Sequence, residues 1–121
     1  MDKYQLLNGG DLAFIGDAYL ELQIRKHVID KGITNLHNLH NETVKYVSRD
    51  NQYKIINVLY DELDEEEKEI FKRGRNHNYK DKSKEYVNAS GYEAVIGYLY
   101  LLERYERLDY LINKSIEIIE K

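Results

Sequence analysis

Apolar residues recur along this chain with the spacing of α-helices. The first strong segment runs from about residue 11 to residue 31 and stops at Gly32, which suits the C-terminal cap of a helix. Apolar side chains cover nearly its whole circumference, so the pattern predicts a central, buried helix. These side chains are Leu12, Phe14, Ile15, Ala18, Tyr19, Leu20, Leu22, Ile24, Val28 and Ile29.

The middle of the chain predicts two further helices and a loop. Apolar residues at helical spacing from residue 44 to residue 63 indicate one amphipathic helix. Asp64 and Glu67 have the spacing of a capping box, which predicts the start of a short helix that runs through Phe71. Residues 73–84 are polar and predict an exposed loop.

The last third of the chain predicts two more helices. Residues 92–102 form a second very apolar helix, although the run from Ala94 to Leu102 would also suit a buried strand. The chain offers no second strand to pair with it. Residues 108–119 predict a final amphipathic helix. Without proline and with only seven glycines, the chain is expected to be all-α. We expect five to six or more helices around one core, in a single domain over residues 1–121.

The composition narrows the class of protein. A hydrophobic content of 42% with 33% charged residues is typical of a soluble globular domain. No apolar run approaches the ~18–20 residues of a membrane span, and no secretory signal precedes the first helix. The absence of cysteine excludes disulfides and thiolate metal sites and suits a reducing cytoplasm. We therefore expect a cytoplasmic protein with no membrane partner.

The net charge of −4 argues against a nucleic-acid partner, but the charges are unevenly distributed. Residues 61–69 hold seven acidic residues and one lysine, whereas residues 72–84 hold six basic residues and one aspartate. The second segment is either a solvated loop or a surface for phosphate oxygens, because its side chains are rich in hydrogen-bond donors. The candidate RNA-binding residues are Arg73, Arg75, Asn76, Lys80, Lys82 and Lys84.

Two carboxylates lie within the two most apolar helices. Asp17 and Glu93 would each be costly to bury unless paired, and one alone would be explained by a salt bridge. Two carboxylates brought together repel each other, and a divalent cation removes that penalty. Oxygen-only ligation suits Mg²⁺ or Mn²⁺. A glycine near each, Gly16 and Gly97, would allow backbone or ligand to approach closely.

Two other sets of residues leave alternatives open. Glu21 lies one turn beyond Asp17 and either joins the carboxylate site or is solvated. His37 and His40 have the spacing of metal ligands, but no third ligand accompanies them, so a turn or packing role is favoured.

Several motifs resemble those of a known family. Residues 12–18 (LAFIGDA) and 91–101 (GYEAVIGYLYL) resemble the two signature helices of the ribonuclease III catalytic domain. Residues 72–76 (KRGRN) resemble a basic motif of that family's short bacterial branch, which lacks a double-stranded-RNA-binding domain. With shorter matches elsewhere, the resemblance covers residues 6–119.

The resemblance implies a dimeric, Mg²⁺-dependent endoribonuclease that cuts both strands of double-stranded RNA. It implies that Asp17 and Glu93 are the catalytic residues and metal ligands, that Mn²⁺ can substitute for Mg²⁺, and that Phe14 anchors the dimer interface. The usual substrate of the branch is precursor 23S ribosomal RNA, matured in the cytoplasm. RNA architecture or a ribosomal protein would help to select it.

The sequence departs from the family pattern at three positions that bear on function. Ala13 and Ser90 stand where full-size ribonuclease III has metal-binding acids, as they do in the short branch, so water or RNA phosphates would complete the coordination. Val87 stands where the branch commonly has an arginine, which removes one RNA contact. The thin ligand set keeps an alternative open, a catalytically inactive module that binds structured RNA.

Overall fold

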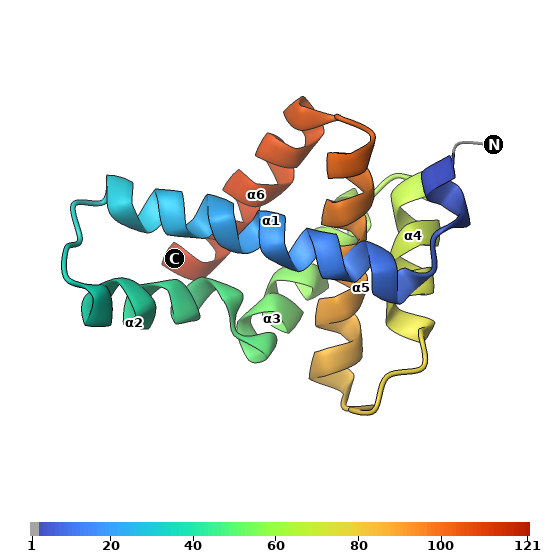
Figure 1. Cartoon of the computed structure of the whole chain (residues 1–121), viewed down its shortest axis with the longest axis horizontal. Helices are drawn as coiled ribbons and strands as arrows, with labels where there is room; N and C mark the ends of the chain where they lie inside the picture. The colour runs from blue at the N-terminus through green and yellow to red at the C-terminus, as the bar shows by residue number, and fades with distance from the viewer. Residues whose placement is uncertain (1–2) are drawn as a thin grey trace.

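The computed structural model describes residues 3–121, which form six α-helices and two short 3₁₀ helices (Figure 1). No strand occurs in this range, so the all-α prediction is confirmed and residues 94–101 lie in a helix. In chain order the elements are η1 (Lys3–Leu6), α1 (Gly9–Asp30), α2 (Leu36–Val47), α3 (Arg49–Leu59), η2 (Tyr60–Glu62), α4 (Glu65–Asn76), α5 (Lys84–Leu101) and α6 (Tyr105–Glu120).

Helix α5 forms the centre of the fold. Every residue from 89 to 99 is buried, as expected for a helix that is apolar nearly all round. Figure 1 shows α1 crossing α5, with α4 along one side of α5 and α3 near the crossing. Helix α2 packs at the far end of α1, away from α4, and α6 packs against α3, α5 and α2.

Helices α1 and α5 meet through their backbones. A Cβ atom on Gly16 would lie 1.7 Å from the carbonyl oxygen of Glu93, and one on Gly97 would lie 2.0 Å from the carbonyl oxygen of Leu12. No side chain fits at either position, so glycine is required by the close approach. The crossing brings Asp17, the residue after Gly16, to the face of α5 that carries Glu93.

The prediction of one helix over residues 44–63 is wrong. Two helices replace it, α2 and α3, and they are separated at Ser48, whose backbone is extended with φ −61° and ψ 150°. The Ser48 hydroxyl accepts a hydrogen bond from the Asn51 N–H at 3.3 Å and so caps α3. A serine side chain that satisfies a backbone donor in this way favours a helix start over a helix interior. The break places Arg49 in the first turn of α3.

The prediction that α1 is buried on all sides is also wrong. Phe14, Leu22 and Ile29 have 81%, 61% and 59% of their surface exposed, and Ala18 on the same face is exposed as well. Among residues 3–121, no element buries these side chains.

The capping box at the start of α4 is confirmed, but the helix is longer than the sequence suggests. Asp64 accepts a hydrogen bond from the Glu67 N–H at 2.8 Å, and Glu67 Oε1 accepts one from the Asp64 N–H at 3.0 Å. The helix continues to Asn76, so Arg73, Arg75 and Asn76 are helical and the loop covers only residues 77–83. A membrane-spanning helix is absent from residues 3–121, where each helix is too short or too polar.

The Gly16→Ala substitution should be strongly destabilising. The new methyl group would overlap the Glu93 carbonyl and force α1 away from α5, and we expect the free energy of unfolding to fall by about 3 kcal/mol in urea denaturation. Gly32→Ala is the matched control, because its Cβ meets nothing within 4 Å and only the positive φ of 85° opposes it, at about 1–2 kcal/mol. Equal losses in the two variants would contradict a backbone contact at Gly16.

Candidate active site

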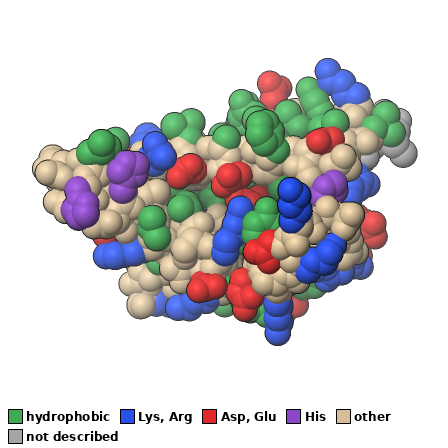
Figure 2. All heavy atoms as spheres, turned by 60° about the horizontal axis from the view of Figure 1, so that its bottom comes forward, with side chains coloured by type: hydrophobic (Ala, Val, Ile, Leu, Met, Phe, Trp, Pro, Cys, Tyr) green, Lys and Arg blue, Asp and Glu red, His purple; other side chains and the backbone are tan. Residues whose placement is uncertain are grey.

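One pocket contains both predicted carboxylates. Asp17 comes from α1 and Glu93 from α5, and α3 and the 77–83 loop complete the lining. The lining residues are Gly10, Ala13, Phe14, Asp17, Arg49, Tyr79, Tyr86, Ser90 and Glu93. Figure 2 shows acidic and basic side chains close together on this side of the molecule, with histidine both at the α1–α2 end and on the other side of these charged groups. The crossing of α1 and α5 thus brings Asp17 and Glu93 to one pocket.

Glu93 is the buried member of the pair. Its side chain is 3% exposed, and its Oε1 atom accepts a hydrogen bond from Arg49 Nη1 at 2.8 Å. Its Oε2 atom is buried and has no hydrogen-bond partner. Burial raises the pKa of Glu93 to about 8; the nearby carboxyl group of Asp17 raises it too, while Arg49 acts in the opposite direction.

Asp17 is exposed, which corrects the expectation of apolar surroundings. Its neighbours Phe14 and Ala18 lie on the open face of α1, whereas Ala13, Gly16 and Leu20 are buried. The pair is therefore asymmetric. Glu93 is fixed by packing, while Asp17 remains accessible to water and to a substrate.

Arg49 is a site residue that the sequence analysis missed. Its guanidinium carbon lies 4.6 Å from the centre of the Tyr86 ring, within cation–π distance, and the side chain remains 40% exposed. The available signal was Ser48, a capping residue that marks the start of α3 and so sets the position of the next side chain. Nothing in the chain order relates residue 49 to residue 93.

A chain of aromatic rings connects the pocket to the 77–83 loop. The ring of Tyr86 lies 5.3 Å from that of Tyr79, which lies 4.8 Å from the ring of His77. The Tyr79 hydroxyl donates a hydrogen bond to the Gly74 carbonyl at 2.7 Å. These contacts hold the loop against the site and the end of α4.

The donor set fits a divalent cation bound by oxygen atoms. The unpartnered Oε2 atom of Glu93 is the observation that supports this, because a buried carboxylate oxygen needs a proton or a cation. Among residues 3–121, no third acid or histidine joins the two carboxylates. Glu21 does not line the pocket and pairs with Arg25 at 3.3 Å. The two carboxylate groups of Asp17 and Glu93 alone would leave room for water or phosphate oxygens in the coordination shell of the cation.

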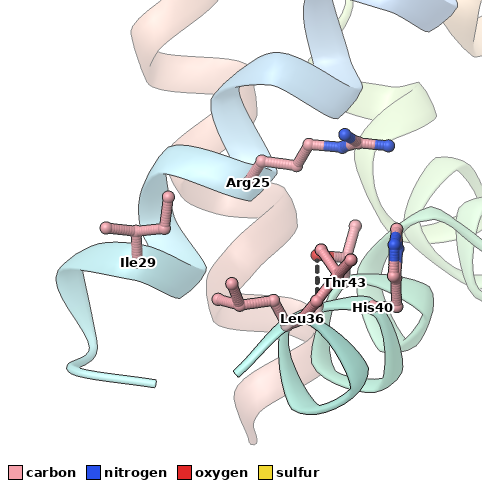
Figure 3. Close-up of a pocket in the computed structure, with 6 residues that line it drawn as sticks. Arg25, Ile29, Leu36, His40 and Thr43 are labelled. Atoms are coloured by element: carbon pink, nitrogen blue, oxygen red, sulfur yellow. Dashed lines mark hydrogen bonds between the residues drawn. The ribbon is translucent and has the colours of Figure 1, made fainter. Parts of the chain in front are cut away.

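The two histidines with metal-like spacing lie elsewhere. His37 Nε2 is 3.1 Å from the side-chain nitrogen of Asn41 on the same helix. His40 lines an apolar hollow between α1 and α2, where Figure 3 places it on α2 with Leu36, across from Ile29 on α1. Both histidines are exposed, and neither belongs to a cluster of three or more possible metal ligands within residues 3–121.

The basic residues of the predicted loop are divided between two places. Arg73 donates to the Leu7 carbonyl at 3.2 Å, and Arg75 lies over the Phe71 ring and donates to Asn76 at 3.2 Å. Arg73, Arg75 and Asn76 do not line the carboxylate pocket. Exposed lysines occupy the loop and the first residue of α5; they are Lys80, Lys82 and Lys84.

The whole site lies within a recognised domain. Residues 10–104 match the family model of the ribonuclease III domain. The crystal structure of a protein from Fusobacterium nucleatum superimposes with a TM-score of 0.86 at 35% identity, covering 97% of this chain and 98% of that one. The chain belongs to the ribonuclease III family of endoribonucleases.

Full-length similarity places the chain more narrowly. It is 44% identical to Mini-ribonuclease 3 of Streptococcus pneumoniae, over 99% of both chains. It is also 44% identical to Mini-ribonuclease 3 of Thermoanaerobacter sp., over 91% of this chain and 81% of that protein. Mini-ribonuclease 3 of Staphylococcus aureus is 39% identical, over 97% and 92% respectively. The resemblance to the short branch is thereby confirmed.

The raised pKa of Glu93 predicts how stability depends on pH without divalent cations. Between its ordinary value of 4.5 and about 8, the folded state binds more protons than the unfolded state, so the free energy of unfolding falls as pH rises through this interval. Glu93→Gln removes the ionisable group, and we expect urea denaturation in EDTA at pH 9 to give a variant more stable by about 1–3 kcal/mol.

The exposed Glu69 supplies a control for this measurement. Glu69→Gln should leave the pH dependence of the wild type unchanged. Parallel pH profiles for wild type and Glu93→Gln would contradict the raised pKa.

Proposed function

We propose that this protein is an Mg²⁺-dependent endoribonuclease that cleaves double-stranded RNA by hydrolysis of phosphodiesters. The observation that carries the proposal is the buried, unpartnered oxygen of Glu93 beside the exposed carboxylate of Asp17. Membership of the ribonuclease III family supplies the class of reaction.

Asp17 and Glu93 would hold the cation, with Mn²⁺ able to replace Mg²⁺. Bound Mg²⁺ supplies a Lewis acid that lowers the pKa of water and stabilises charge on the phosphate. Burial fixes the Glu93 carboxylate in one position. The accessible Asp17 carboxylate can accept a hydrogen bond from the attacking water and orient it toward phosphorus.

The exposed lysines of the 77–84 segment, Lys80, Lys82 and Lys84, would contact backbone phosphates next to the pocket. Arg73, Arg75 and Asn76, at the end of α4, would extend this surface away from the carboxylates. Such contacts read the shape of an A-form duplex more than its sequence, and they make affinity fall steeply with salt. The overall charge of −4 does not oppose them, because the basic residues are concentrated here.

A homodimer through the open face of α1 completes the proposal. Phe14, Ala18, Leu22 and Ile29 share one side of the helix, and the three larger side chains are more than half exposed. A second copy of the chain would bury this face, with Phe14 as the anchor beside the pocket. Two pockets in one dimer would serve the two strands of a duplex.

We infer precursor 23S ribosomal RNA, in the cytoplasm, as the substrate, on the strength of the sequence resemblance. The cations near the pocket would contact backbone phosphates, which carry no sequence information, so RNA architecture or a ribosomal protein would direct the protein to its cleavage site. Val87 on α5 supplies no charge to this contact.

Asp17→Asn should reduce cleavage of a long double-stranded RNA in Mg²⁺ by at least about 100-fold, because the water and cation lose an anionic ligand. The exposed position predicts an unchanged thermal melting curve and an unchanged sedimentation coefficient. Glu21→Gln, one turn away and outside the pocket, is the matched control and should cleave like wild type.

The same assay separates the proposal from its alternative. Wild-type protein that binds the duplex but leaves it intact with Mg²⁺ would indicate an inactive RNA-binding module. Wild-type protein that neither binds nor cleaves the duplex would reject both the endoribonuclease and the inactive RNA-binding module. Wild-type-like cleavage by Asp17→Asn would reject the site assignment.

A further inference from the structure

Arg49 is the one cationic side chain among the residues that line the carboxylate pocket. It comes from α3, whereas the carboxylates come from α1 and α5. The other arginines with carboxylate partners within residues 3–121 lie outside this pocket: Arg25 pairs with Glu21, Arg104 with Glu66 and Arg107 with Glu67. The position of Arg49 is therefore specific to the site and requires an explanation.

The attachment of Arg49 to the site leaves most of its hydrogen-bonding capacity unused. A guanidinium has five N–H donors, and Nη1 makes the hydrogen bond to Glu93 Oε1. The Tyr86 ring, at 4.6 Å, stabilises the cation without consuming a donor. With 40% of the side chain exposed, the guanidinium can turn over the ring toward a group in solvent.

The charges of the pocket favour an anion near Arg49. The negative charges of the two carboxylates and the positive charge of one divalent cation cancel. With the cation bound, the net charge of the site is therefore the single positive charge of Arg49. That charge equals in magnitude the charge of one phosphodiester. Within residues 3–121, no third acid joins Asp17 and Glu93 to balance a second divalent cation. Arginine matches this role because its planar fork binds two phosphate oxygens together.

We propose that Arg49 binds the scissile phosphate: Glu93 holds its guanidinium in the free enzyme, and the guanidinium exchanges Glu93 for non-bridging phosphate oxygens when RNA and cation are bound. The inference rests on the proposed function and adds a substrate-binding residue to it. The exchange has two consequences of opposite sign. Without RNA, Arg49 opposes cation binding by occupying Glu93; with RNA, it stabilises the substrate.

Arg49→Gln tests both consequences. Calorimetric titration with Mg²⁺ at pH 8.5, without RNA, should give a dissociation constant about three- to tenfold lower than that of wild type, because a competing positive charge is gone. Single-turnover cleavage of double-stranded RNA at saturating Mg²⁺ should be at least about tenfold slower. Arg49→Lys keeps the charge but not the fork, and it should fall between wild type and Arg49→Gln in both measurements.

Arg25→Gln is the matched control, because Arg25 also pairs with a glutamate but lies outside the pocket, and both measurements should match wild type. Weaker Mg²⁺ binding by Arg49→Gln would assign Arg49 only to holding Glu93 in place and would overturn the proposal. Unchanged values in both measurements would also overturn it. A wild-type protein that neither binds Mg²⁺ nor cleaves RNA would instead reject the proposed function.

Discussion

The contact between the backbones of α1 and α5 is the constraint on which the site depends. Because Gly16 and Gly97 have no side chains, the two helices approach until a Cβ atom on either would overlap the carbonyl oxygen of the other helix. Two residues that are distant in sequence, Asp17 and Glu93, then line the same pocket. The packing of the apolar helix α5 thus also sets the environment of each carboxylate, since it buries Glu93 while Asp17 stays exposed at the edge of the contact.

This asymmetry between the carboxylates determines what each can do. The fold stabilises the uncharged form of Glu93, so a cation that binds there must overcome both a proton and the Arg49 guanidinium. Asp17 can meet water and substrate directly. The end of α2 at Ser48 has a part in this arrangement, because it begins α3 where Arg49 reaches Glu93 and the Tyr86 ring.

Local sequence signals predicted the parts of the fold that local interactions determine. The apolar spacing located α1, α5 and α6 but missed the break between α2 and α3. The capping box located the start of α4, and two carboxylates in apolar helices indicated that they lie close together. The exposed face of α1 could not be predicted, because a helix periodicity does not reveal which apolar side lacks a neighbour. Arg49 was missed because its role arises from tertiary contact with α5, which the spacing of residues in the chain does not encode.

Anomalous diffraction from crystals grown with Mn²⁺ tests the central claim most directly. The account predicts a manganese peak bound by carboxylate oxygens of both Asp17 and Glu93, with the Oε2 atom of Glu93 among the ligands. A peak elsewhere in the molecule, with the Arg49–Glu93 ion pair intact and the carboxylate pocket empty at saturating Mn²⁺, would contradict it.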